Sequence, residues 1–243
     1  MDSEQGKEIN VEIPDTNIKS QCGSYKGQIP LYEEGLNERS AGADFAQAPA
    51  LHPVIVALSP CFTPISNPDA AYQSSTTKID ISTIPDFTML SSISDGSLTV
   101  SFNTTVEKLQ VPSSWSNWGS PPDAESSTPA VLFSLARNTL TLNLSRTVTT
   151  FGFELSPDML GTYNYTADFY QDSNLYGTIT RQVFIPSGSR LFAATAVCSP
   201  FNKVTINIAA GQDSAGFAIA QIRYVLAPQP TQLTRGIDIL SLS

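Results

Sequence analysis

Short segments in which apolar and polar residues alternate recur along most of the chain. A period of two is typical of half-buried β-strands. Gly, Pro, Asn and Ser gather between the segments, as they do in turns. The alternating segments are Ser97–Phe102, Thr139–Leu144, Val148–Leu155, Tyr163–Tyr170, Leu175–Thr180, Val204–Ile208 and Phe217–Leu226. We therefore expect several short strands.

No long segment keeps the 3.6-residue apolar period of an amphipathic helix. Parallel strands need crossover connections, which are usually helices, so the strands are expected to pair antiparallel. The pattern predicts an all-β protein, an antiparallel β-sandwich of jelly-roll-like form with an extended N-terminal arm.

The chain divides into three predicted parts. Residues 1–50 form an acidic arm, residues 51–227 the β-sandwich domain, and residues 228–243 a C-terminal tail. Val54–Leu58 is a short apolar run between prolines and predicts a buried strand, and Ile237–Leu240 predicts a final edge strand.

The arm is distinguished by its charge. Residues 1–44 carry nine acidic residues against four basic ones, a net of −5. Within the arm, Ile9, Val11 and Ile13 alternate with polar residues, as in a strand. Two interpretations stay open: a disordered leader, or a docking arm that adds a strand to a neighbouring copy. No positive segment followed by an apolar one predicts a secretory signal peptide.

Composition excludes several classes of function. The chain has 243 residues, of which 41% are hydrophobic, so it can bury a core. Its 13 basic and 22 acidic residues give a net charge of −9, which argues against nucleic-acid binding. No apolar run is long enough to span a membrane. We expect no cofactor and no bound metal.

The most individual stretch is a loop that holds both tryptophans. Trp115 and Trp118 precede Asp123 and Glu125 in a segment whose glycine and two prolines disfavour a helix or a central strand. On one interpretation the indole rings stack on sugar rings, helped by Tyr163 or Tyr165, while the carboxylates accept hydroxyl hydrogen bonds. On the other, the tryptophans are buried and cover one end of the sandwich.

Catalysis has weak support. His52 is the chain's one histidine and lies where the arm meets the domain. The sequence contains no nucleophile motif that this histidine could activate as a general base. Asp123 and Glu125 are the candidate carboxylates for glycoside hydrolysis. Asp123 with Glu125, or Asp95 with Asp158, is a candidate for Ca²⁺, although no calcium-loop motif is present. We expect a protein that is not an enzyme.

Three cysteines, Cys22, Cys61 and Cys198, are far apart and show no metal or redox spacing. Cys61 and Cys198 both lie beside prolines near predicted strand ends, so one alternative is that they pair and leave Cys22 odd. The other is three free thiols. An odd cysteine in an extracellular protein suggests a bridge between molecules.

Residues 97–226 resemble β-sandwich domains of bacterial secreted and surface proteins, including PEP-CTERM-associated ones. The resemblance rests on Ser97–Phe102, Trp118–Glu125, Val148–Leu155, Arg190–Thr195 and Phe217–Tyr224. It implies a jelly-roll-like sandwich outside the cell with no established catalytic set. The chain departs from the sorted members because Asp238–Ser243 contains no PEP motif, apolar helix or basic cluster.

Two functions follow as hypotheses. The first is a non-enzymatic surface protein, of a cell or a spore, that self-assembles into filaments: Ile9–Ile13 pairs with the next subunit, and Cys22 forms a disulfide with Cys61 or Cys198. The partner is then a second copy of the chain. The alternative is an extracellular carbohydrate-binding module, whose partner is a glycan.

Overall fold

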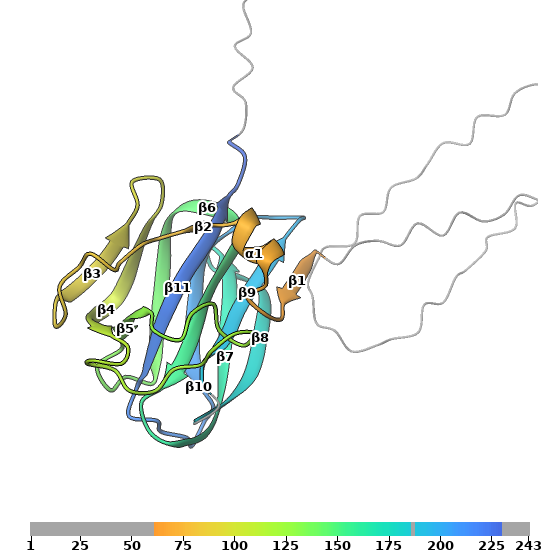
Figure 1. The fold of residues 1–243 in the computed structure, drawn as a ribbon. Helices are drawn as coiled ribbons and strands as arrows, with labels where there is room; N and C mark the ends of the chain where they lie inside the picture. Colours follow the sequence, from red (N-terminus) through yellow and green to blue (C-terminus); the bar gives the residue numbers. More distant parts are fainter. Residues whose placement is uncertain (1–60, 186–187, 230–243) are drawn as a thin grey trace, which may run out of the picture. The chain divides into compact units, whose positions relative to one another are not determined.

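The protein, described by a computed structural model over residues 61–185 and 188–229, consists of antiparallel strands and one short helix (Figure 1). The elements are β1 (Phe62–Ile65), α1 (Ala70–Ser75), β2 (Thr77–Lys78), β3 (Met89–Ser94), β4 (Thr99–Gln110), β5 (Ala130–Phe133), β6 (Thr139–Pro157), β7 (Gly161–Gln171), β8 (Asn174–Ile185), β9 (Arg190–Ala196), β10 (Phe201–Ile208) and β11 (Phe217–Leu226). Every strand pair is antiparallel among these residues.

The strands form two layers that share the longest strand, β6. The first part of β6 pairs with β4 and β10, and its later part pairs with β9 and β11. One layer is therefore β3–β4–β6–β10–β7–β8, and the other is β5–β11–β6–β9–β1 with β2 beside β11. Strands that pass from one layer to the other are a known way to close a sandwich. The predicted antiparallel β-sandwich is confirmed.

Alternation along the strands builds the main core between the layers. Leu140 and Leu142 on β6 belong to the same buried cluster as Phe217 and Ile219 on β11. Because neighbouring strand residues point to opposite faces, the first part of β6 places the polar side chains of Thr141 and Asn143 on its other face. The predicted strand Phe217–Leu226 coincides with β11, and two predicted segments, Thr139–Leu144 and Val148–Leu155, are parts of the single strand β6.

The outer face of the second layer is also covered. Ala218 and Ala220, which alternate with Phe217 and Ile219 on β11, pack in a second small cluster with Trp115. The cover is the long connection between β4 and β5. As a result the second layer is buried on both faces, and charged residues on its strands lie under this cover.

Helix α1 covers the neighbouring part of the same face. Its N-cap, Asp69, accepts a hydrogen bond from the amide of Tyr72 at 2.8 Å. Tyr72 packs on Leu191 and Ala193 of β9. Gly152 on β6 permits this approach, because a Cβ there would collide with the Tyr72 hydroxyl and with Ala193. Among the described residues no helix is long and apolar enough to cross a membrane.

A disulfide links Cys61, before β1, to Cys198, after β9, with a sequence separation of 137 and an S–S distance of 2.01 Å. Of the two alternatives for these cysteines, the pair is the one present. The bridge from Cys22 in the assembly hypothesis stays a prediction, and it would first require this bond to break.

Several predictions lie outside the described residues. They are the strands Val54–Leu58, Ile237–Leu240 and Ile9–Ile13, the thiol of Cys22, and His52. The structure adds five strands that alternation did not predict, β1, β2, β3, β5 and β9, and the helix α1.

Candidate functional site

A gap opens along one edge of β11. On this edge β5 pairs with Ala218–Ala220, and β2 pairs only from Arg223 onward, while Ile79 donates to the carbonyl of Ile222 at 3.0 Å. Gln221 therefore lies where one neighbouring strand ends and the next begins. The backbone on either side of the gap is hydrogen-bonded, so the opening is fixed by strand pairing.

A β-bulge lies at the same point on the other edge of β11. Between the pairs Ala220↔Glu154 and Arg223↔Gly152, β11 has two residues and β6 has one. Gln221, the first residue of the bulge, has a φ of 50°. Glycine is the residue that adopts this left-handed region without steric cost, so glutamine is held there at a backbone penalty. Bulges often reorient side chains beside functional sites.

A polar pocket of about 460 Å³ occupies the gap. Its floor is Ala220–Ile222 of β11, one wall is Lys78–Ser82 and the other is Thr128–Ala130 with Gln110. Glu125 and Gln73 close it at the end near α1. The volume lies within the usual range for small-ligand sites, but the lining is far more polar than is common.

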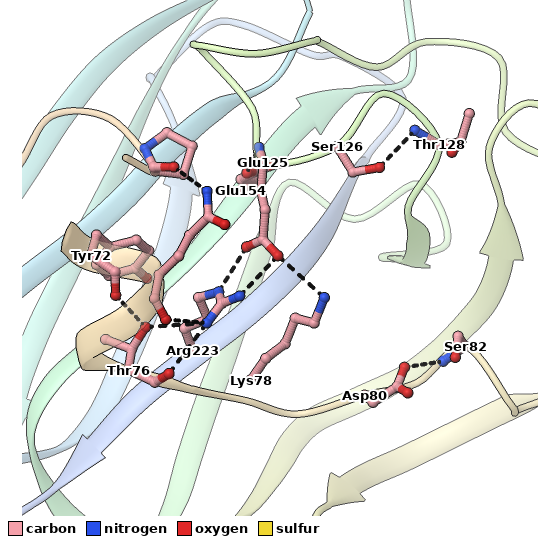
Figure 2. A network of polar contacts seen from close by, with 12 residues as sticks. Tyr72, Thr76, Lys78, Asp80, Ser82, Glu125, Ser126, Thr128, Glu154 and Arg223 are labelled. Carbon is pink, nitrogen blue, oxygen red and sulfur yellow. Dashed lines mark hydrogen bonds and ion pairs between the residues drawn. The ribbon is translucent and has the colours of Figure 1, made fainter. Parts of the chain in front are cut away.

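Glu125 forms the most connected part of the lining. Its carboxylate accepts two hydrogen bonds from Arg223, from Nε at 2.7 Å and from Nη2 at 2.9 Å, and pairs with Lys78 Nζ at 3.2 Å (Figure 2). Partial burial favours the neutral acid, but the hydrogen bonds and charge of Arg223, and then Lys78, outweigh it and lower the pKa of Glu125. Glu125 is therefore ionised and held in place.

Arg223 connects this loop to the end of α1. Its Nη1 donates to the carbonyl of Gln73 at 3.0 Å and to that of Thr76 at 3.3 Å (Figure 2). These are carbonyls of the last helical turn, which have no partner within a helix. One guanidinium thus joins β11, α1 and the Glu125 loop, and defines the α1 end of the pocket.

A second carboxylate, Glu154 on β6, binds the β4–β5 connection that carries Glu125. It is completely buried, and it accepts hydrogen bonds from the Glu125 amide at 2.5 Å and from Trp118 Nε1 at 3.2 Å. Burial, the largest influence, raises the pKa of Glu154 to about 7 despite these two bonds. Two adjacent carboxylates thus have pKa values displaced in opposite directions by their surroundings.

Glu154→Gln is expected to remove a pH dependence of stability. In the wild type, the pKa is raised from 4.5 to about 7, so between these values the folded protein keeps a proton that the unfolded chain releases. The free energy of unfolding should therefore fall as pH rises from 4.5 to 7, by roughly 3 kcal/mol in total.

The glutamine variant should lose this fall, because its amide does not titrate and can still accept from the Glu125 amide. Urea unfolding at pH 5 and pH 8 checks this for both proteins. Glu125, whose pKa is lowered, contributes stability that is lost only at more acidic pH, below the window of Glu154. An equal fall in both proteins contradicts the assignment.

The predicted site residues are only partly brought together. Trp115 is buried in the second cluster and its Nε1 donates to the carbonyl of Asn117 at 2.7 Å, so no ring face is open to a sugar. Trp118 packs against the same cluster and holds Glu154. Asp123 pairs with Arg190 at 2.7 Å, whereas Glu125 lines the pocket.

The two tyrosines that the stacking hypothesis adds, Tyr163 and Tyr165, are not exposed aromatic faces. Tyr165 is fully buried, with its hydroxyl 2.6 Å from that of Ser214, and Tyr163 lies partly buried against the main core. For the calcium candidates, Asp95 accepts the Tyr224 hydroxyl at 2.6 Å. No group of three or more His, Cys, Asp or Glu side chains that could hold a metal occurs in the described part of the chain.

Comparisons with known proteins do not identify a family for this chain. No family model matches, and no curated protein matches. Among solved structures, the enzymatically active domain of bacteriophage CBA120 tailspike protein 4 is 17% identical, over 54% of this chain and 20% of that one, with a TM-score of 0.28. The family 11 carbohydrate-binding module of Clostridium thermocellum Lic26A-Cel5E is 7% identical over 64% and 97%, with a TM-score of 0.30. At such scores neither likeness identifies a function or a ligand site.

Proposed function

We propose that the protein is a non-catalytic carbohydrate-binding module that holds a neutral sugar in the pocket beside Gln221. The observation that carries this proposal is the polar pocket of about 460 Å³ at the bulge, which is lined by Gln221, a residue with a strained backbone. A backbone penalty at one residue is common where a side chain contacts a ligand.

The chemistry of the lining suits sugar hydroxyls. Gln221 brings an amide to the lining, and Gln110 brings its amide oxygen, because its Nε2 already donates to the carbonyls of Val111 and Thr128. Carboxylate and hydroxyl oxygens come from Asp80, Ser82, Ser126 and Thr128. A sugar hydroxyl both donates and accepts, so it matches mixed groups of this kind. The wall residues are fixed by local bonds, such as that from the Ser82 amide to Asp80 Oδ1 at 2.9 Å (Figure 2).

The charges around the pocket support a neutral ligand. The cations Lys78 and Arg223 are both engaged by Glu125, and Asp80 adds one further anion on the wall. Two positive and two negative groups therefore cancel. A strongly anionic or cationic ligand would leave one sign of charge uncompensated.

The carboxylates support binding without cleavage. Glycoside hydrolysis requires an acid with a raised pKa that reaches the leaving oxygen. Glu154 has the raised pKa but none of its surface is exposed. Glu125 reaches the pocket, but both of its oxygens are bonded to Arg223 and its pKa is lowered.

The disulfide supports a protein that works in an oxidising compartment, such as the exterior of a cell. Self-assembly through residues 1–50 stays a prediction, because those residues lie outside the described ones. A location on the spore surface also stays a prediction, because no observation on this protein tests it.

Gln221→Gly tests the proposal, because glycine adopts a φ of 50° without cost. The variant should fold with stability equal to the wild type within about 1 kcal/mol, since relief of strain offsets the freer unfolded chain. Loss of the side chain's hydrogen bonds should weaken sugar binding by about tenfold. The measurement is a glycan array on the wild type, followed by calorimetric titration of both proteins with the glycan selected.

Ala215→Gly is the matched control, because Ala215 has a φ of 54° and lies outside the pocket lining. It should leave sugar affinity unchanged. If the wild type binds no glycan on a broad array, or if both variants bind as the wild type does, the proposal is wrong.

A further inference from the structure

Phe87 combines two features that packing and turn chemistry do not explain. Its side chain is 66% exposed, and its backbone has a φ of 64°. Exposed apolar residues are common singly. A bulky residue in the left-handed region is uncommon, because glycine, asparagine or aspartate fits there at lower cost. A turn alone would therefore favour a different residue at this position.

The loop that presents Phe87 is held on both sides. The Phe87 amide donates to the Lys108 carbonyl at 2.8 Å, and the Lys108 amide donates to the Thr88 carbonyl at 2.9 Å. The preceding residue, Asp86, pairs with the buried Lys108 Nζ at 2.6 Å and accepts from Ser114 Oγ at 3.0 Å. The ring is thus exposed on a fixed backbone.

This loop continues directly from the pocket wall. Ser82 lines the pocket, and the chain between Ser82 and Phe87 is fastened by a turn in which the Ile84 amide donates to the Ile81 carbonyl at 3.2 Å. On the other side, Lys108 lies two residues before Gln110, which also lines the pocket. Two residues along a strand span about 7 Å, so the backbone of Phe87, which bonds to Lys108, lies about that far along β4 from Gln110.

This inference rests on the proposed function. We propose that the side chain of Phe87 forms a second subsite, in which its ring stacks against the next sugar of an oligosaccharide that has one unit in the pocket. A sugar ring has an apolar face of C–H groups that suits an aromatic ring, and its hydroxyls point to the rim. The pocket lining includes no aromatic side chain, so Phe87 supplies the flat aromatic contact that the pocket lacks. The ligand class is a neutral oligosaccharide with an unsubstituted ring face.

Phe87→Asn tests this subsite, because asparagine tolerates the left-handed backbone and removes the ring. The variant should bind the oligosaccharide selected on the array about three- to tenfold more weakly, a loss typical of one aromatic contact. It should bind the corresponding monosaccharide within about twofold of the wild type. Phe87→Trp should retain oligosaccharide binding.

Phe184→Ala is the matched control, since Phe184 on β8 is 46% exposed and is not part of the pocket lining. It should leave both affinities unchanged. If Phe87→Asn leaves oligosaccharide binding unchanged while Gln221→Gly weakens it, the subsite is wrong and the proposed function stands. If Phe87→Asn weakens monosaccharide binding equally, Phe87 is not a second subsite. If the wild type binds no sugar, both proposals fail.

Discussion

Arg223→Met is expected to lower the free energy of unfolding by about 3 to 5 kcal/mol, the usual cost of removing one partner from a buried ion pair. Arg223 is 8% exposed and forms two hydrogen bonds with Glu125. The variant leaves the Glu125 carboxylate with Lys78 alone and leaves two carbonyls at the end of α1 without their donor. Urea unfolding at neutral pH measures the loss.

A double variant, Arg223→Met with Glu125→Gln, separates the ion pair from the other contacts. It should recover part of the loss, because no uncompensated carboxylate then remains. The carbonyls of Gln73 and Thr76 stay unpaired in both variants, so recovery should be incomplete. A loss below about 1 kcal/mol in the single variant contradicts the view that Arg223 holds this end of the pocket together.

Replacing Cys61 and Cys198 with serine is expected to lower the free energy of unfolding by about 2 to 5 kcal/mol. The bond spans 137 residues, so the cross-link greatly restricts the unfolded chain. It also fastens β1, which pairs with β9 through only four residue pairs. Urea unfolding of the oxidised wild type and the double variant measures the difference.

Reductant supplies the control for the disulfide. It should lower the stability of the wild type to that of the Cys61→Ser, Cys198→Ser variant and leave the variant unchanged. If the oxidised wild type and the variant unfold at the same urea concentration, the disulfide does not contribute to the stability of the sandwich.

The strands that alternate in sequence are those with one face in the main core. β4, β7 and β10 were predicted in part or in full for this reason. β9 was missed because it is buried almost throughout, from Leu191 to Ala194, so its sequence does not alternate. β5 was missed for a similar reason, since Val131 and Leu132 face different buried clusters.

The site itself was predicted in only one residue, Glu125. A signal for two others was present: Glu154 and Arg223 are charged residues inside otherwise apolar strand segments. Charged residues in a buried layer need partners, so these two residues of opposite charge indicated a buried network of ion pairs and hydrogen bonds. The partners could not be read from the sequence, because Arg223 and Glu125 are 98 residues apart and meet only through the fold.

The positive φ values of Gln221 and Phe87 have no sequence signal either. Both arise where strand pairing and loop hydrogen bonds force a conformation that the residue type disfavours. The tryptophan loop shows the converse. Its composition was consistent with a ligand site or with a buried cover. Its rings cover the second layer, and its later residues Glu125, Ser126 and Thr128 line the pocket.

The central claim is that the pocket beside Gln221 binds a neutral sugar. The most direct measurement is an NMR titration of the isotope-labelled full chain with the glycan that the array selects, following backbone and glutamine side-chain amides. We predict that the largest shifts belong to Gln221, Gln110, Ser126 and Ser82, and that they saturate together. Saturable shifts that leave these residues unchanged and cluster elsewhere on the sandwich would contradict the claim.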